Sequence, residues 1–130
     1  MALEITFTDL ATQYYRLFND VYIHAFTYMI LLDILTGLAK AWRQHKLNSS
    51  ISSAGLIKHC ITAVICISVY PWLLFTGFKG LAYGLLGFFT VNYAISNVEN
   101  LDALGVKFPK WVTKRLEKIK KDFDEEEKGL

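Results

Sequence analysis

The sequence predicts an all-α integral membrane protein with three transmembrane helices, a short amphipathic N-terminal helix and a juxtamembrane C-terminal helix. Apolar stretches over residues 21–39, 61–78 and 81–98 follow one another closely, and the last two contain no charged residue. Each stretch approaches the roughly 20 residues that a helix needs to cross a bilayer. A chain of 130 residues that is 53% hydrophobic has too small an interior to hide three helices that are apolar on every side.

Residues 1–20 are expected to form an amphipathic segment at the outer membrane interface. Thr6 and Asp9 are spaced like a helix-capping pair, and apolar residues follow at helical spacing: Phe7, Leu10, Tyr14, Leu17 and Val21. An ordinary lead-in turn to the first span is the alternative. The segment is acidic and has no small-residue cleavage site after a short apolar run, so we do not expect a signal peptide.

Transmembrane helices are expected over residues 21–42, 58–78 and 79–100, with a basic cytoplasmic connection over residues 43–57. The segment from Lys40 to Lys58 carries four basic residues and no acidic one, and eight more Lys or Arg follow Leu101. Short segments rich in Lys and Arg stay on the cytoplasmic side of a membrane. The charge pattern therefore predicts a multi-pass protein with its N-terminus outside and its C-terminus in the cytoplasm.

Residues 101–130 are expected to form a charged amphipathic tail on the cytoplasmic side. An apolar stripe runs along one helical face, formed by Val112, Leu116, Ile119 and Phe123. Basic side chains near a membrane surface each gain about 1 kcal/mol from anionic headgroups. The basic residues expected at that surface are Arg43, Lys46, Lys58, Lys114, Lys118 and Lys121.

Polar residues inside the spans are the first candidate functional positions. A carboxylate at the depth of Asp33 costs about 2.5–3.5 kcal/mol on insertion scales, so it must be protonated, partnered or facing water. It faces another helix or a pore, or it makes a structural hydrogen bond to Thr36 or to a polar group of the third span. In that third span Asn92, Ser96 and Glu99 share one helical face, which could line an aqueous path.

Small residues are the second candidate feature, because they let helices approach closely within lipid. A stripe of glycines runs from the end of the second span into the third, and the first span carries a smaller version: Gly77, Gly80, Gly84 and Gly87, then Gly37 and Ala41. Packing within one subunit and packing between subunits are both compatible with these stripes.

Catalytic and metal-binding patterns are missing from the sequence. His24, His45 and His59 are scattered without metal-ligand spacing, and no nucleophile lies beside a base. We expect no cofactor, no metal and no enzymatic activity. An intramembrane enzyme built on Asp33 and Glu99 is the remaining catalytic alternative.

Two short motifs resemble the bacteriophage holins of the toxin-secretion and phage-lysis type. The first covers residues 31–37 (LLDILTG), Ala41, residues 46–49, Gly55 and Lys58; the second covers Asn92, Ile95, Ser96, residues 98–101 and 104–106, and Pro109. The resemblance extends over roughly residues 30–120. Tyr93 and the Lys58-His59 pair depart from the family pattern, which has an acidic residue and a pair of lysines there in many members.

The resemblance implies that the chain accumulates in the host bacterial cytoplasmic membrane, oligomerises and opens lesions that give an endolysin access to the cell wall. The implied partners are the lipid bilayer and further copies of the chain, with a functional link to an endolysin and an antiholin as a further candidate; nucleic acid is not among them. A pore for non-lytic toxin or effector export and a membrane scaffold without a pore are the alternatives. Our hypothesis is that Asp33 and the face of Asn92, Ser96 and Glu99 bias the balance between a dry oligomer and an open hole.

Overall fold

The computed structural model describes residues 4–46 and 49–129, with side chains in the second range described from residue 53 onward. This described part is helical and contains no strand. Its elements are α1 (Phe7–Arg16), a 3-10 turn (Leu17–Asn19), α2 (Val21–Arg43), α3 (Ser49–Phe75), α4 (Lys79–Ala103) and α5 (Lys110–Lys128).

Polar caps start the first two α-helices. The side chain of Thr6 accepts a hydrogen bond from the backbone of Asp9, and the Asp9 carboxylate accepts one from the backbone of Thr6. Asp20 then caps α2, because its side chain accepts hydrogen bonds from the backbone N–H groups of Tyr22 and Ile23. The predicted capping pair is confirmed, and residues 7–16 form a helix rather than a simple lead-in turn.

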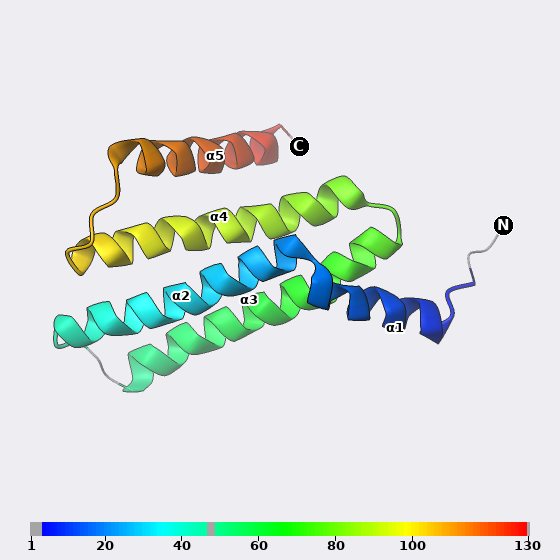
Figure 1. Ribbon diagram of the computed structural model, residues 1–130, viewed down its shortest axis with the longest axis horizontal. Helices are drawn as coiled ribbons and strands as arrows, with labels where there is room; N and C mark the ends of the chain where they lie inside the picture. Colours follow the sequence, from blue (N-terminus) through cyan, green and yellow to red (C-terminus); the bar gives the residue numbers. More distant parts are fainter. Residues whose placement is uncertain (1–3, 47–48, 130) are drawn as a thin grey trace.

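Helices α2, α3 and α4 lie side by side as a bundle, and α2 packs most closely on α4 (Figure 1). A glycine with positive φ follows the C-terminal end of α3 and another follows that of α4. These are Gly77, with φ 89°, and Gly105, with φ 93°. The next residues bond back to the helix, since Phe78 N–H donates to Leu73 O and Val106 N–H donates to Leu101 O.

Among the described residues, three helical segments are long and apolar enough to cross a membrane: Val21–Arg43, Ser53–Phe75 and Lys79–Ala103. Only 28%, 22% and 17% of their most apolar windows are buried inside the protein, so most of each helix surface faces outward. The buried interior is a thin seam that includes Phe26, Cys66, Tyr70, Ala82 and Leu86. These features confirm the predicted fold class.

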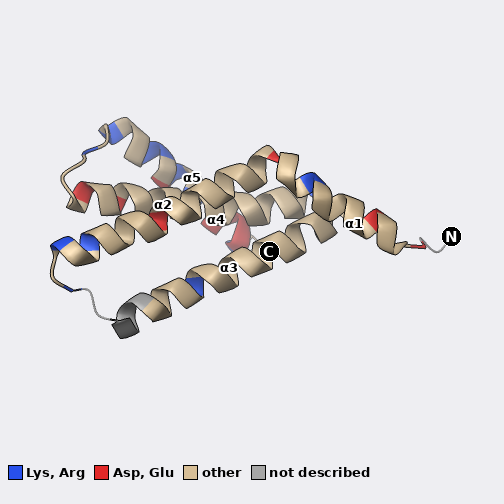
Figure 2. Ribbon diagram, turned by 60° about the horizontal axis from the view of Figure 1, so that its bottom comes forward, with Lys and Arg blue, Asp and Glu red and all other residues tan. Residues whose placement is uncertain are grey.

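Basic residues gather at the end of the bundle where α2 finishes and α5 begins, which we call the basic end (Figure 2). Arg43 lies there and donates a hydrogen bond of 2.6 Å to Leu104 O, which links the end of α2 to the end of α4. Cations at helix C-termini are favoured because carbonyl groups without a helical partner point outward there.

Two features differ from the expected layout. Helix α3 begins at Ser49, so much of the connection expected over residues 43–57 is helical. Helix α5, in the segment expected to be a cytoplasmic amphipathic tail, turns back along α4 (Figure 1). Its apolar stripe finds a partner there, because Phe123 packs edge-to-face on Phe88 with ring centroids 6.0 Å apart.

Candidate functional site: a polar cluster between the spans

Asp33 is the centre of a polar cluster between α2, α3 and α4. Its side chain is 7% exposed. Asn100 on α4 donates a hydrogen bond of 3.1 Å from Nδ2 to Asp33 Oδ1. His59 on α3 places Nε2 3.7 Å from Asp33 Oδ2. The carboxylate on α2 is therefore partnered by both neighbouring helices, and the partner on α4 is a polar group of the third span.

Asn97 joins α2 to α4. Its Nδ2 donates to the backbone oxygen of Met29 on α2 at 2.9 Å and to the backbone oxygen of Tyr93 at 2.8 Å. Its Oδ1 lies 3.2 Å from the hydroxyl of Thr36, and that hydroxyl also accepts a 3.2 Å hydrogen bond from Asn100 Nδ2. Thr36 does not bond to the Asp33 carboxylate; its hydroxyl donates to Leu32 O at 2.8 Å.

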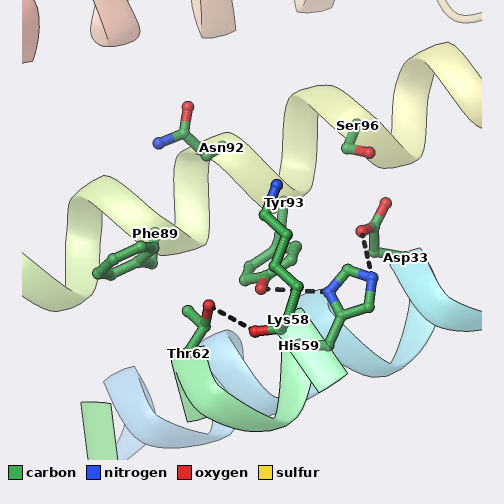
Figure 3. Close-up of a pocket in the computed structure, with 8 residues that line it drawn as sticks. All are labelled: Asp33, Lys58, His59, Thr62, Phe89, Asn92, Tyr93 and Ser96. Carbon is green, nitrogen blue, oxygen red and sulfur yellow. Dashed lines mark hydrogen bonds and ion pairs between the residues drawn. The ribbon is translucent and has the colours of Figure 1, made fainter. Parts of the chain in front are cut away.

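Tyr93 extends the cluster across the bundle. Its hydroxyl lies 3.2 Å from His59 Nδ1, with donor and acceptor roles set by the histidine tautomer. A chain of polar contacts thus runs from Tyr93 on α4 through His59 on α3 to Asp33 on α2 (Figure 3). Such contacts satisfy polar groups that lipid would leave without partners.

A cavity of about 330 Å³ adjoins this cluster. Figure 3 shows Asn92 and Ser96 on α4, and Lys58, His59 and Thr62 on α3. Its lining consists of Asp33, Lys58, His59, Thr62, Phe89, Asn92, Tyr93 and Ser96. Polar side chains from α2, α3 and α4 therefore reach this cavity, although more of its lining surface is apolar than polar.

The structure brings together most of the polar positions that the sequence singled out. Asp33, Asn92 and Ser96 line one cavity, and Thr36 joins the adjoining hydrogen-bond network. Glu99 lies elsewhere, in a small hollow against α5 beside Thr113 and Leu116. The shared face on α4 therefore divides between two surroundings, and Glu99 stays exposed beside α5.

The predicted helix-packing residues also lie in different surroundings. A Cβ on Gly37 would lie 3.7 Å from Asn100 Nδ2, and one on Gly87 would lie 3.4 Å from the ring of Phe123. Both glycines thus lie at contacts within this chain. A Cβ added to Gly80 or Gly84 would meet no other part of the protein within 4 Å, and Gly77 belongs to the turn after α3. Ala41 is half-buried.

The basic positions also differ in their surroundings. Lys58 lines the cavity, and Arg43 bonds to the end of α4. Lys121 pairs with Glu125 at 3.7 Å on the exposed side of α5. The remaining predicted surface cations are exposed: Lys46, Lys114 and Lys118.

Four members of the cluster were not among the predicted site residues: His59, Tyr93, Asn97 and Asn100. The sequence did contain a signal, since Tyr93, Asn97 and Asn100 are spaced i, i+4 and i+7 and share one helical face. That face lies against Asp33 and Thr36 of α2.

The chemistry available to the cluster is hydrogen bonding and proton exchange. Among the residues that the structure describes, no group of three or more His, Cys, Asp or Glu could hold a metal ion. Asp33 and Glu99, the pair on which a catalytic alternative rested, lie in different surroundings.

Comparisons with known proteins agree with this membrane architecture. Residues 12–121 match the model of the bacteriophage holin family. A probable holin of Bacillus phage phi105 is 30% identical over 84% of this chain and 82% of its own length. The uncharacterized protein YqxH of Bacillus subtilis (strain 168) is 34% identical over 90% of this chain and 84% of its own length. No solved structure matches. Because the family match covers most of the chain, including all three spans, this protein belongs to the bacteriophage holin family.

Proposed function

We propose that this holin oligomerises in the cytoplasmic membrane of the bacterial host and forms lesions that give an endolysin access to the cell wall. The observation that carries the proposal is the cluster around Asp33. It places a carboxylate, a histidine and several amides inside a bundle whose spans are otherwise apolar. Polar residues at such depth are expensive in lipid and mark functional positions.

The cluster suggests how one chain can occupy two states. In the packed state the polar groups bond to one another across α2, α3 and α4. If the helices separate and their polar faces turn toward water, the cost of burying Asp33 is relieved. Many subunits that rearrange together would then line a hole, and a small difference between the two states sets when it opens.

Lesion formation is tested by expressing the chain under an inducible promoter in a bacterium, without and with an endolysin. We expect the membrane to depolarise and to admit an impermeant dye after a delay, and lysis to occur only when both proteins are present. A polarised, dye-tight membrane at high levels of inserted protein would favour a scaffold. Dye uptake without release of co-expressed endolysin would favour a small export pore.

Orientation can be tested in the same cells before the membrane depolarises. With Cys60→Ser and Cys66→Ala as background, we expect a membrane-impermeant maleimide to label Thr8→Cys in intact cells. Gln44→Cys at the basic end should be labelled only after permeabilisation, because basic flanks are retained in the cytoplasm. The reverse pattern would place the N-terminus inside.

A further inference from the structure

The cavity beside Asp33 contains more hydrogen-bond donors than the protein uses. Lys58 of α3 and Asn92 and Ser96 of α4 line it, and their side chains make no hydrogen bond or ion pair within the described part of the chain. Figure 3 shows the Lys58 side chain rising from α3 toward α4, where Asn92 and Ser96 lie. No buried polar side-chain atom of the described residues lacks a partner, but these three side chains border apolar helices and are free to bind a polar occupant.

The donor set indicates what that occupant is. An ammonium, an amide NH₂ and a hydroxyl all donate, and an ammonium also supplies positive charge. A phosphate group matches such a set, because it is anionic and has several acceptor oxygens. The two oxygens of Asp33 already face Asn100 and His59, so the carboxylate lies at the inner wall.

The position of the cavity fits a lipid better than a free anion. Lys58 is exposed and lies on the same helical face as Thr62 and Ile65, and Ile65 is itself exposed among outward-facing apolar residues of α3. A headgroup in the cavity could therefore leave its acyl chains along Ile65, in the bilayer. The volume of about 330 Å³ is in the range of small-ligand pockets and suits a headgroup rather than a whole phospholipid.

We propose that this cavity binds the phosphate of an anionic phospholipid headgroup, with Lys58, Asn92 and Ser96 as its donors. The lipid would enter from the leaflet at the basic end of the bundle and bridge α3 to α4. Binding there would stabilise the packed bundle, because the lipid contacts both helices only while they lie together. The inference does not rest on lesion formation, and lipid retention can be measured on protein that forms no lesion.

The test uses the full chain purified in a non-ionic detergent and equilibrated with equal amounts of phosphatidylglycerol and phosphatidylcholine. Native mass spectrometry then counts lipids retained on each species. We expect the wild type to retain phosphatidylglycerol preferentially. Lys58→Gln should lower that preference about fivefold, the equivalent of about 1 kcal/mol for one cation near an anionic lipid. Ser96→Ala should lower it less, because it removes one neutral donor.

The matched control is Lys46→Gln, which removes the same charge at the basic end without touching the cavity. Equal losses in Lys58→Gln and Lys46→Gln would show general surface attraction and overturn the site. Displacement of the lipid by millimolar glycerol phosphate would show a site for free phosphate and overturn the lipid assignment. If Lys58→Gln keeps its lipid but no longer forms dimers, Lys58 contacts a second copy of the chain, and the lipid assignment is overturned.

Discussion

Replacing Asp33 with asparagine is expected to delay membrane depolarisation markedly at equal levels of inserted protein. Asparagine keeps an oxygen that can accept the hydrogen bond from Asn100, so the packed state is retained. It removes the charge whose burial costs about 2.5–3.5 kcal/mol on insertion scales. Loss of that cost shifts the balance toward the packed state by up to about 300-fold.

The measurement is the time from induction to collapse of the membrane potential, followed with a voltage-sensitive dye. Asp102→Asn is the matched control, because it removes a carboxylate from an exposed position near the end of α4. We expect that control to depolarise the membrane on the wild-type schedule. If Asp33→Asn also keeps the wild-type schedule, Asp33 has no part in setting the balance. Earlier depolarisation would mean that its partnered charge mainly holds the bundle closed.

The spans could be predicted from the sequence because they depend on local properties. Uninterrupted apolar stretches determine where a helix can cross a bilayer, and Thr6 with Asp9 determines where α1 begins. The start of α3 was less clear, since the serine-rich residues before Lys58 carry no apolar periodicity. The structure nevertheless continues the helix back to Ser49.

The partners of Asp33 could not be predicted in full, because they depend on how three helices are rotated about their axes. The sequence offered a polar group of the third span as one alternative, but it did not distinguish Asn92 from Asn100. His59 looked isolated because its partners, Asp33 and Tyr93, lie on other helices. Spacing along one helix identifies a shared face and leaves open which neighbour that face meets.

The contact of α5 with α4 could not be predicted from the sequence for the same reason. The stripe that includes Leu116 and Phe123 is apolar enough for a membrane surface or for another helix, and spacing alone does not separate the two. In the structure the stripe lies against α4, with Phe123 over Gly87 and Leu116 beside Glu99.

Replacing Asn97 with leucine is expected to lower the stability of the bundle more than replacing Asn92, another polar residue of α4, with leucine. Asn97 is 6% exposed, and its amide bonds to Met29 O on α2 and to Tyr93 O. Side-chain hydrogen bonds between membrane helices contribute about 0.6 kcal/mol on average and up to about 1.7 kcal/mol. With the contact to Thr36 also lost, we expect the free energy of unfolding to fall by about 1–2 kcal/mol. Circular dichroism during titration of the detergent-solubilised protein with sodium dodecyl sulfate measures this loss.

Asn92→Leu provides the control, because it makes the same change on the same helix at a half-buried position that bonds to no other helix. In protein freed of bound lipid, its effect should stay within about 0.5 kcal/mol. Asn97→Ala separates lost hydrogen bonds from the added bulk of leucine: if the bonds between α2 and α4 stabilise the bundle, alanine should destabilise it too. Equal stability of Asn97→Leu and Asn92→Leu would show that the hydrogen bonds of Asn97 do not stabilise the contact between α2 and α4. The polar links between these helices would then be those of Asn100 with Asp33 and Thr36, and that of Arg43 with Leu104 O.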